Sequence, residues 1–292
     1  MSLLAAKSPG KMTNSSHARL RRFSVSAYAA APDCPPETFC QMLAERGFGG
    51  IGLTAHEVDT ASPRALRQML AAHGLVATSL NSAGYVLHTD LAARRAQAAL
   101  DDRLFAAAAE LDAPVNLIPG GVLHAAPGTS LVDARALVAE GIARLAERAR
   151  REGVRLSLEP FHPMAIGKRG CINQISAAIA AIAPFPWLGL TLDLHHSWWD
   201  AELETLLREQ AHRIMLIQIC GIELPADGSA PRRAELGAAG TPEVRRILRL
   251  ADEAGYTLGI EYEVFHEQLG APVVETLLDR AAADLLEILE PT

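Results

Sequence analysis

The run LGLTLDLHHSWWD, residues 188–200, starts as a buried strand and ends in chemically active side chains. Side chains alternate between the two faces of a strand, so Leu192 and Leu194 share one face while Thr191 and Asp193 share the other. We expect the leucines to pack against surrounding helices, which turns Asp193 toward the interior. The run therefore predicts a parallel strand whose carboxyl end carries a functional site.

The same plan recurs along the whole chain. Apolar strands are expected at residues 23–28, 49–54, 75–81, 114–120, 154–160, 188–194, 214–220 and 258–264. Helical patterns are expected at residues 35–47, 62–74, 90–112, 130–153, 173–183, 200–212, 241–255 and 271–289. Several begin with capping residues and end in glycine. Eight strand–helix units predict an α/β fold, a single (β/α)8 TIM barrel.

A doubly wound sheet is the rival fold, but that class usually has a glycine-rich phosphate loop after its first strand. Here SVSAYAAAPDC follows instead, and the chain has no GxGxxG motif. The length of 292 residues suits one large barrel, and no change of composition marks a later boundary. We expect a disordered or added tail at residues 1–20 and one barrel domain at residues 21–292.

The charge and the apolar content limit the classes of partner. The net charge is −7, so no basic surface predicts a nucleic acid or an acidic membrane as partner. No run approaches the ~20 apolar residues of a membrane span, and the amino terminus lacks a signal peptide core. The four cysteines have no CxxC spacing. These features favour a cytoplasmic protein without a disulfide framework.

The chemistry of a TIM barrel collects at the carboxyl ends of its strands. Alternation turns Glu159 and Asp193 inward, and it places Glu261 and Glu263 on one face with Glu263 nearer the mouth. Gln218 ends the seventh expected strand. Three converging carboxylates repel one another unless a proton or a cation lies between them, and oxygen ligands suit Mn²⁺ or Mg²⁺. The alternative is that each acid pairs with a lysine or arginine in a structural ion pair.

The aromatic and imidazole side chains after Asp193 allow two interpretations. Strict alternation favours His195 as the inward histidine, whereas a pair of half-buried surface histidines is the simpler alternative. Trp198 and Trp199 would anchor the next helix by packing, or they would form an aromatic wall for a sugar.

Three motifs resemble those of a known family, the xylose isomerase-like TIM barrels. This superfamily includes sugar phosphate isomerases and epimerases and endonuclease IV-like enzymes. The motifs are LSLEP (156–160), LDLHH (192–196, the Asp-x-x-His of the family) and GYTLGIEYEVF (255–265). The likeness covers residues 22–290, and LEPFHPM with HHSWWDAEL resembles one branch of the superfamily.

The resemblance implies roles for named residues. It implies a divalent metal site formed by Glu159, Asp193, Gln218 and Glu263, with Mn²⁺ or Mg²⁺ favoured and Zn²⁺ or Co²⁺ as alternatives. Within the Asp-x-x-His pattern, His196 rather than His195 would contact substrate or metal. Further positions that resemble substrate contacts are His162, Arg169 and Arg233. Two positions depart from the common pattern: Gln218 stands where many members have histidine, and Gly52 where many have glutamate.

The implied chemistry is proton transfer next to a carbonyl group. The cation would stabilise an enediolate, while Glu159 and Glu263 remove and return the proton. This predicts an isomerase or epimerase that acts on a small sugar, polyol or keto-acid derivative, in a family where homodimers are common. A dehydratase of the inosose or dehydroshikimate type is the alternative, and a barrel that only binds a ligand is another. An endonuclease for abasic DNA would need more histidines than His56 and His124 provide.

Overall fold

Eight parallel strands close into a barrel in the computed structural model, which describes residues 14–290. Around the barrel the strands follow the order β1-β10-β7-β6-β5-β4-β3-β2. Their bounds are β1 Phe23–Ser26, β2 Gly50–Leu53, β3 Val76–Gly84, β4 Val115–Ile118, β5 Leu156–Leu158, β6 Leu188–Asp193, β7 Ile214–Ile219 and β10 Gly259–Tyr262. The prediction of a single TIM barrel is confirmed, and each of the eight expected strands forms one barrel strand.

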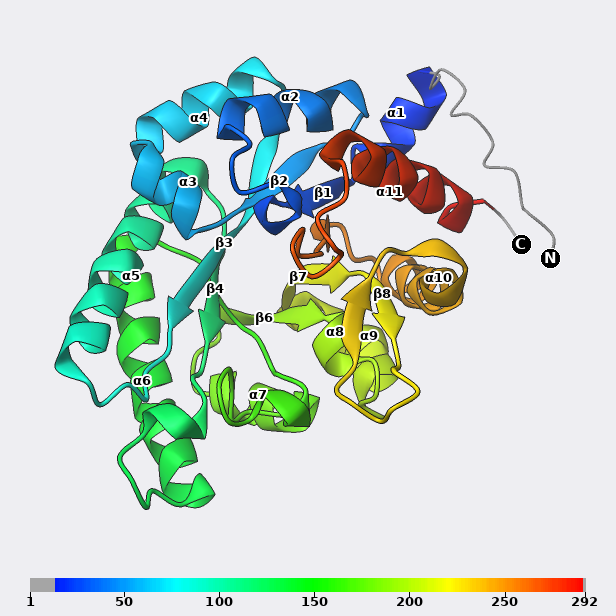
Figure 1. The fold of residues 1–292 in the computed structure, drawn as a ribbon. Coiled ribbons are helices and arrows are strands. Elements are labelled where there is room, and N and C mark those ends of the chain that lie inside the picture. The colour runs from blue at the N-terminus through cyan, green and yellow to red at the C-terminus, as the bar shows by residue number, and fades with distance from the viewer. Residues whose placement is uncertain (1–13, 291–292) are drawn as a thin grey trace.

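Helices surround the barrel, as Figure 1 shows. The main ones are α2 Pro36–Glu45, α4 Pro63–Ala72, α5 Leu91–Leu111, α6 Leu131–Glu152, α7 Ile175–Ile182, α9 Leu203–Gln210, α10 Gly237–Glu253 and α11 Val274–Ile288. The leucines of 188–194 are buried, as the alternation predicts. No described helix is long and apolar enough to span a membrane.

Three elements lie outside the regular plan. Short helices α3 (Ala55–Thr60) and α8 (Leu194–Ser197) follow β2 and β6 directly. A two-stranded antiparallel ribbon, β8 (Gly221–Glu223) with β9 (Arg232–Ala234), is inserted between β7 and α10. The ribbon projects from the barrel in Figure 1. It matters for the site because it carries Arg233.

The expected tail at residues 1–20 divides into two parts. Residues 1–13 lie outside the described residues, whereas Asn14–Leu20 form helix α1. Helix α1 lies beside α11 in Figure 1, and Leu20 is fully buried. Because this helix buries an apolar side chain in the core, the folded part of the chain starts before residue 21.

The strand register sets the level of the polar side chains in the barrel. Asp193 on β6 pairs with Gln218 on β7, and Gln218 pairs in turn with Glu261 on β10. These three side chains therefore lie at one level on three adjacent strands. Glu263 follows β10 one pleat closer to the mouth.

Candidate active site

A cavity of about 200 Å³ opens at the carboxyl ends of the strands. Five of the residues predicted to form the site line it: Glu159, Arg169, His196, Arg233 and Glu263. The remaining lining residues are Tyr28, Asn81, Ser82, Tyr85, Asn116, Ile118, Phe161, His195, Phe265 and Gln268. The fold thus brings together side chains from loops more than 100 residues apart in the sequence, at the end of the barrel where TIM-barrel enzymes act.

Arg233 reaches from the β8–β9 ribbon into the centre of the carboxylates. Its Nη1 donates to Asp193 Oδ1 at 3.2 Å, its Nη2 also contacts Asp193 Oδ2, and Nη2 lies 2.8 Å from Glu263 Oε2. The guanidinium lies 5.3 Å from the centre of the Phe265 ring. All three charged side chains are buried. The ion-pair alternative considered from the sequence therefore applies to Asp193 and Glu263.

Glu159 has different partners. Asn116 Nδ2 donates to its Oε2 at 2.5 Å, and the Nε2 atom of His196 lies 3.8 Å from its Oε1. The same Nε2 lies 3.8 Å from Asp193 Oδ2. Asn116 was not identified from the sequence, although an asparagine inside the apolar strand PVNLIPG is the kind of signal that marks an inward polar contact.

The tautomer of His196 follows from its backbone contact. The N–H of His162 donates to His196 Nδ1 at 3.3 Å, so Nδ1 carries no proton. A neutral imidazole then carries its proton on Nε2, which makes this atom a donor toward the two carboxylates. Burial lowers the pKa of His196 to about 3, which keeps the ring neutral near pH 7. Nε2 of His196 is therefore the ring atom that faces the two carboxylates and is available to a substrate oxygen or a cation.

Burial and mutual repulsion shift the pKa values of the acids. Burial raises the pKa of Glu159 well above its ordinary range, and the charges of Asp193 and Glu263 add to this rise. Burial also raises the pKa of Glu263, with Arg233 opposing the rise and Asp193 adding to it. For Asp193, burial acts in the same direction, but Arg233 outweighs it and the pKa is lowered. Without a further cation the cluster retains protons.

Gln218 lies deeper in the barrel than the cavity. Its Nε2 donates to Glu261 Oε1 at 3.0 Å, whereas its Oε1 is buried without a hydrogen-bond partner among the described residues. A buried amide oxygen without a donor is costly, and a bound cation would satisfy it.

The donor set fits a divalent cation. Glu159, Asp193 and His196 offer atoms that all lie within 4.8 Å of one another. Glu263 lines the same cavity as Glu159 and His196, and Gln218 pairs with Asp193 in the strand register. Among the described residues, one guanidinium, that of Arg233, contacts two of the three carboxylates, those of Asp193 and Glu263. Oxygen-rich ligation with this charge suits Mn²⁺ or Mg²⁺.

Some predicted site residues lie outside the cavity. The ring of His162 accepts from the Met164 N–H and packs edge-on against Trp199. His162 affects the site through its backbone N–H, which donates to His196. Trp199 donates to the His196 carbonyl oxygen at 3.0 Å, and neither it nor Trp198 lines the cavity. The packing interpretation of the tryptophans thus agrees with the structure, whereas Tyr28, Tyr85 and Phe265 supply the aromatic wall.

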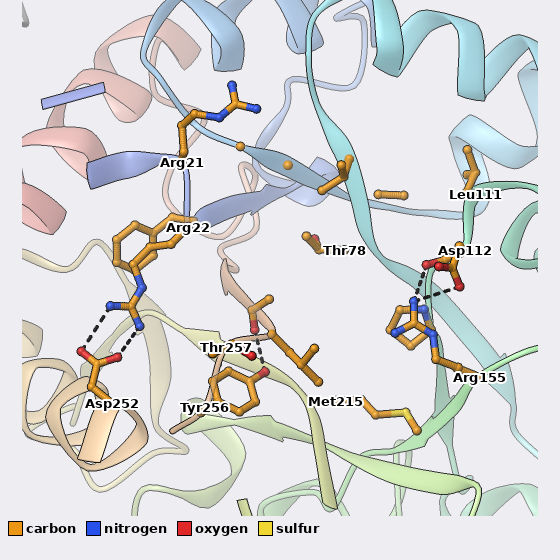
Figure 2. Close-up of a pocket in the computed structure, with 18 residues that line it drawn as sticks. Arg21, Arg22, Thr78, Leu111, Asp112, Arg155, Met215, Asp252, Tyr256 and Thr257 are labelled. Atoms are coloured by element: carbon orange, nitrogen blue, oxygen red, sulfur yellow. Dashed lines mark hydrogen bonds and ion pairs between the residues drawn. The ribbon is translucent and has the colours of Figure 1, made fainter. Parts of the chain in front are cut away.

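A second cavity, of about 680 Å³, lies at the opposite end of the barrel. Figure 2 shows two ion pairs among its charged side chains: Arg22 with Asp252 at 2.7 Å, and Arg155 with Asp112 at 3.3 Å. These pairs are partly exposed. The described residues that line this end include no buried cluster of acids like that around Arg233, so we place the chemistry at the carboxyl-terminal mouth.

Sequence comparison agrees with this architecture. A profile of the xylose isomerase-like TIM barrel family matches residues 40–289. The chain belongs to the xylose isomerase-like TIM barrel family. A comparison of the sequence with curated proteins found no match.

Solved structures share the fold of this xylose isomerase-like barrel. Protein SMc04130 from Sinorhizobium meliloti 1021 is 23% identical with a TM-score of 0.82, covering 93% of this chain and all of its own. The IOLI protein with a bound zinc atom is 14% identical (TM-score 0.72, covering 91% and 97%). The 3-keto-D-glucoside 4-epimerase YcjR from E. coli is 16% identical (TM-score 0.69, covering 91% and 99%). At these identities the likeness shows the fold.

Proposed function

We propose that this protein is a divalent-metal-dependent isomerase or epimerase of a small sugar, polyol or keto-acid derivative. One observation carries the proposal: Glu159 and Glu263 end strands on different sides of one small polar cavity, with Asp193 and Arg233 between them. Two acids that face one substrate can remove a proton and return it. The epimerases among the similar structures support the same reaction type.

The residues divide the work as follows. A cation held by Glu159, Asp193, Gln218 and Glu263 would supply electrophilic stabilisation for two adjacent substrate oxygens. His196, whose Nε2 carries the proton, donates a hydrogen bond to a substrate oxygen. Arg233 holds Asp193 and Glu263 in place and offsets part of their charge. The N–H groups of Arg169, which donates to Tyr85 Oη at 2.7 Å, line the outer wall and orient the substrate.

Glu159 and Glu263 are the proton-transfer pair. Each carboxylate lines the cavity and is buried, so it can reach a substrate held there. Return of the proton to the neighbouring carbon gives isomerisation, and return to the opposite face gives epimerisation. We expect a small-molecule substrate, no nucleic-acid or membrane partner and a cytoplasmic location, in line with the charge and composition.

The test follows proton exchange at carbon. Protein loaded with Mn²⁺ is incubated in D₂O with a panel of ketohexoses, keto-inositols and dehydroshikimate, and deuterium next to the carbonyl is followed by NMR. We expect exchange that Glu159→Gln and Glu263→Gln abolish, with an isomeric product of unchanged mass apart from deuterium. Loss of water with an enone absorbance would instead identify the dehydratase, and no exchange with any compound would argue for a binding protein.

A further inference from the structure

Gln218 sits between two acids on the middle of three adjacent strands. Asp193 on β6 lies on one side of it and Glu261 on β10 on the other. Its amide nitrogen is bound to Glu261 Oε1 at 3.0 Å, and its amide oxygen is buried without a partner among the described residues. Because the nitrogen is held on the β10 side, the oxygen is turned away from Glu261.

Glu261 is itself fixed by neutral donors. Thr78 Oγ1 and Ser79 Oγ donate to its Oε2 at 2.9 and 2.8 Å. With Gln218 Nε2, three donors hold the carboxylate, which is fully buried. Thr78 also lines the floor of the cavity at the opposite end of the barrel, where Figure 2 labels it. The carboxylate thus has a set orientation that does not depend on the residues of the mouth.

Gly52 leaves the space that this carboxylate occupies. A Cβ atom at position 52 would lie 2.3 Å from Glu261 Oε2 and 2.5 Å from its Cδ, closer than atoms can approach. A carboxylate from β10 thus fills the place where a side chain at position 52 would start. The observed position of the Glu261 carboxylate therefore requires glycine at position 52.

We infer that Glu261 is a positioning residue of the cation site, which binds the Gln218 amide nitrogen and thereby presents the amide oxygen as a ligand. The inference rests on the metal dependence in the proposed function. A glutamine amide can turn either its oxygen or its nitrogen toward a cation, but only the oxygen can ligate it. The contact with Glu261 holds the nitrogen and so leaves the oxygen for the cation. Among the described residues this oxygen has no donor, so a cation could take that place.

The first test compares two substitutions at one position. Glu261→Met removes the acceptor, so the amide can rotate, and we expect Mn²⁺ affinity to fall by about 10- to 100-fold. Glu261→Gln retains a carbonyl oxygen that can accept from Gln218, so we expect a fall of less than about threefold. Calorimetry gives the affinity, and the electron paramagnetic resonance spectrum of bound Mn²⁺ reports the ligand geometry.

A swap variant tests whether the location of the carboxylate matters, whichever strand carries it. Gly52→Asp combined with Glu261→Ala returns a carboxylate to the same space from β2, and we expect it to recover most of the Mn²⁺ affinity that Glu261→Met loses. Asp101→Asn is the matched control, because Asp101 is another buried acid with two donors, Gly84 N–H and Gln97, away from the mouth. We expect this control to bind Mn²⁺ like the parent protein.

Each result decides between the alternatives. Unchanged Mn²⁺ affinity and spectrum in folded Glu261→Met would overturn the inference and leave the proposed function standing. If Glu261→Met does not fold, the other two variants provide the test. A 100-fold loss of Mn²⁺ affinity in the folded swap variant, or in folded Glu261→Gln, would also overturn the inference. A parent protein that binds no divalent cation would overturn the metal dependence and the inference together.

Discussion

The two ends of the barrel treat charge in opposite ways. At the amino-terminal end, Arg22 pairs with Asp252 and Arg155 with Asp112 beside an open cavity, and side chains of both pairs are partly exposed to water. At the carboxyl-terminal mouth, Arg233 faces Asp193 and Glu263 with side-chain exposures of 5%, 0% and 6%, and Glu159 adds a further acid. At the amino-terminal end both acids are paired and partly exposed, whereas at the mouth three buried acids share one contacting guanidinium among the described residues, that of Arg233.

This difference distinguishes charged residues that form exposed ion pairs from buried acids that need a further partner. Exposed pairs contribute little to stability because water screens them and the side chains lose entropy. Buried acids in excess of their basic partners are costly, so a fold retains them where another ligand or a reaction needs them. We therefore base the proposed site on the excess of buried acids at the mouth rather than on the size of the cavity.

The largest effect is expected from Arg233→Met. It leaves Asp193 and Glu263 buried without their guanidinium, so the free energy of unfolding should fall by about 3–5 kcal/mol in protein without metal. Saturating Mn²⁺ should restore part of this loss, because a cation can replace the missing charge. Urea denaturation with and without Mn²⁺ measures both quantities. A loss below about 1 kcal/mol would mean that the ion pairs of Arg233 contribute no more to stability than the exposed pairs at the opposite end.

A buried acid outside both ends gives the next largest effect. Burial raises the pKa of Asp101 to about 6, above its ordinary value of 3.8. The folded state therefore binds this proton more tightly, and stability is lost as the pH rises from about 4 to about 6. Asp101→Asn should be more stable than the parent protein by about 2 kcal/mol at pH 7.5 and equal to it at pH 4. Thermal unfolding across this range provides the test, and a pH-independent difference would refute it.

The affinity of the mouth for a divalent cation should depend on pH. The pKa of Glu263 is raised to about 8, so near neutral pH a divalent cation must displace a proton from the cluster. Apparent Mn²⁺ affinity should rise by up to about tenfold per pH unit between pH 6 and 8 and then level off. Calorimetry in buffers with different ionisation enthalpies counts the released protons. A count of zero at pH 7 would contradict the raised pKa.

The smallest effect is expected at the opposite end. Arg22→Met removes the partner of Asp252, but both side chains stay hydrated, so the free energy of unfolding should change by less than about 1 kcal/mol. Added Mn²⁺ should not alter the change, in contrast to Arg233→Met. The same urea titration compares the two variants. Equal losses in both would remove the distinction between the ends.

The barrel could be predicted from the sequence because its signals are local. Apolar strands such as Leu188–Asp193 and helices ending in glycine, such as α6 with Gly153, repeat with a regular spacing. The β8–β9 ribbon was missed because each of its strands has three residues and little apolar content. Helix α1 was missed because its length of seven residues and polar sequence resemble a tail, whereas its packing, on α11 among other elements, is a tertiary contact.

The inward acids could also be predicted, since alternation fixes the direction of Glu159 and Asp193 from the strand alone. Their partners could not be. Arg233 approaches from an insertion 40 residues beyond Asp193, and Asn116 meets Glu159 across neighbouring strands. The direction of the His196 proton depends on one backbone N–H, that of His162, which no pattern of residue types encodes.

The place of β10 in the barrel links the site to folding. This last strand pairs with β1 and so closes the ring, and the same short segment delivers Glu261 and then Glu263 to the interior. Until β10 docks, Arg233 and Gln218 lack their partners on that side. We therefore expect a barrel that β10 has not closed to lack the Gln218–Glu261 and Arg233–Glu263 contacts, and with them the proposed site.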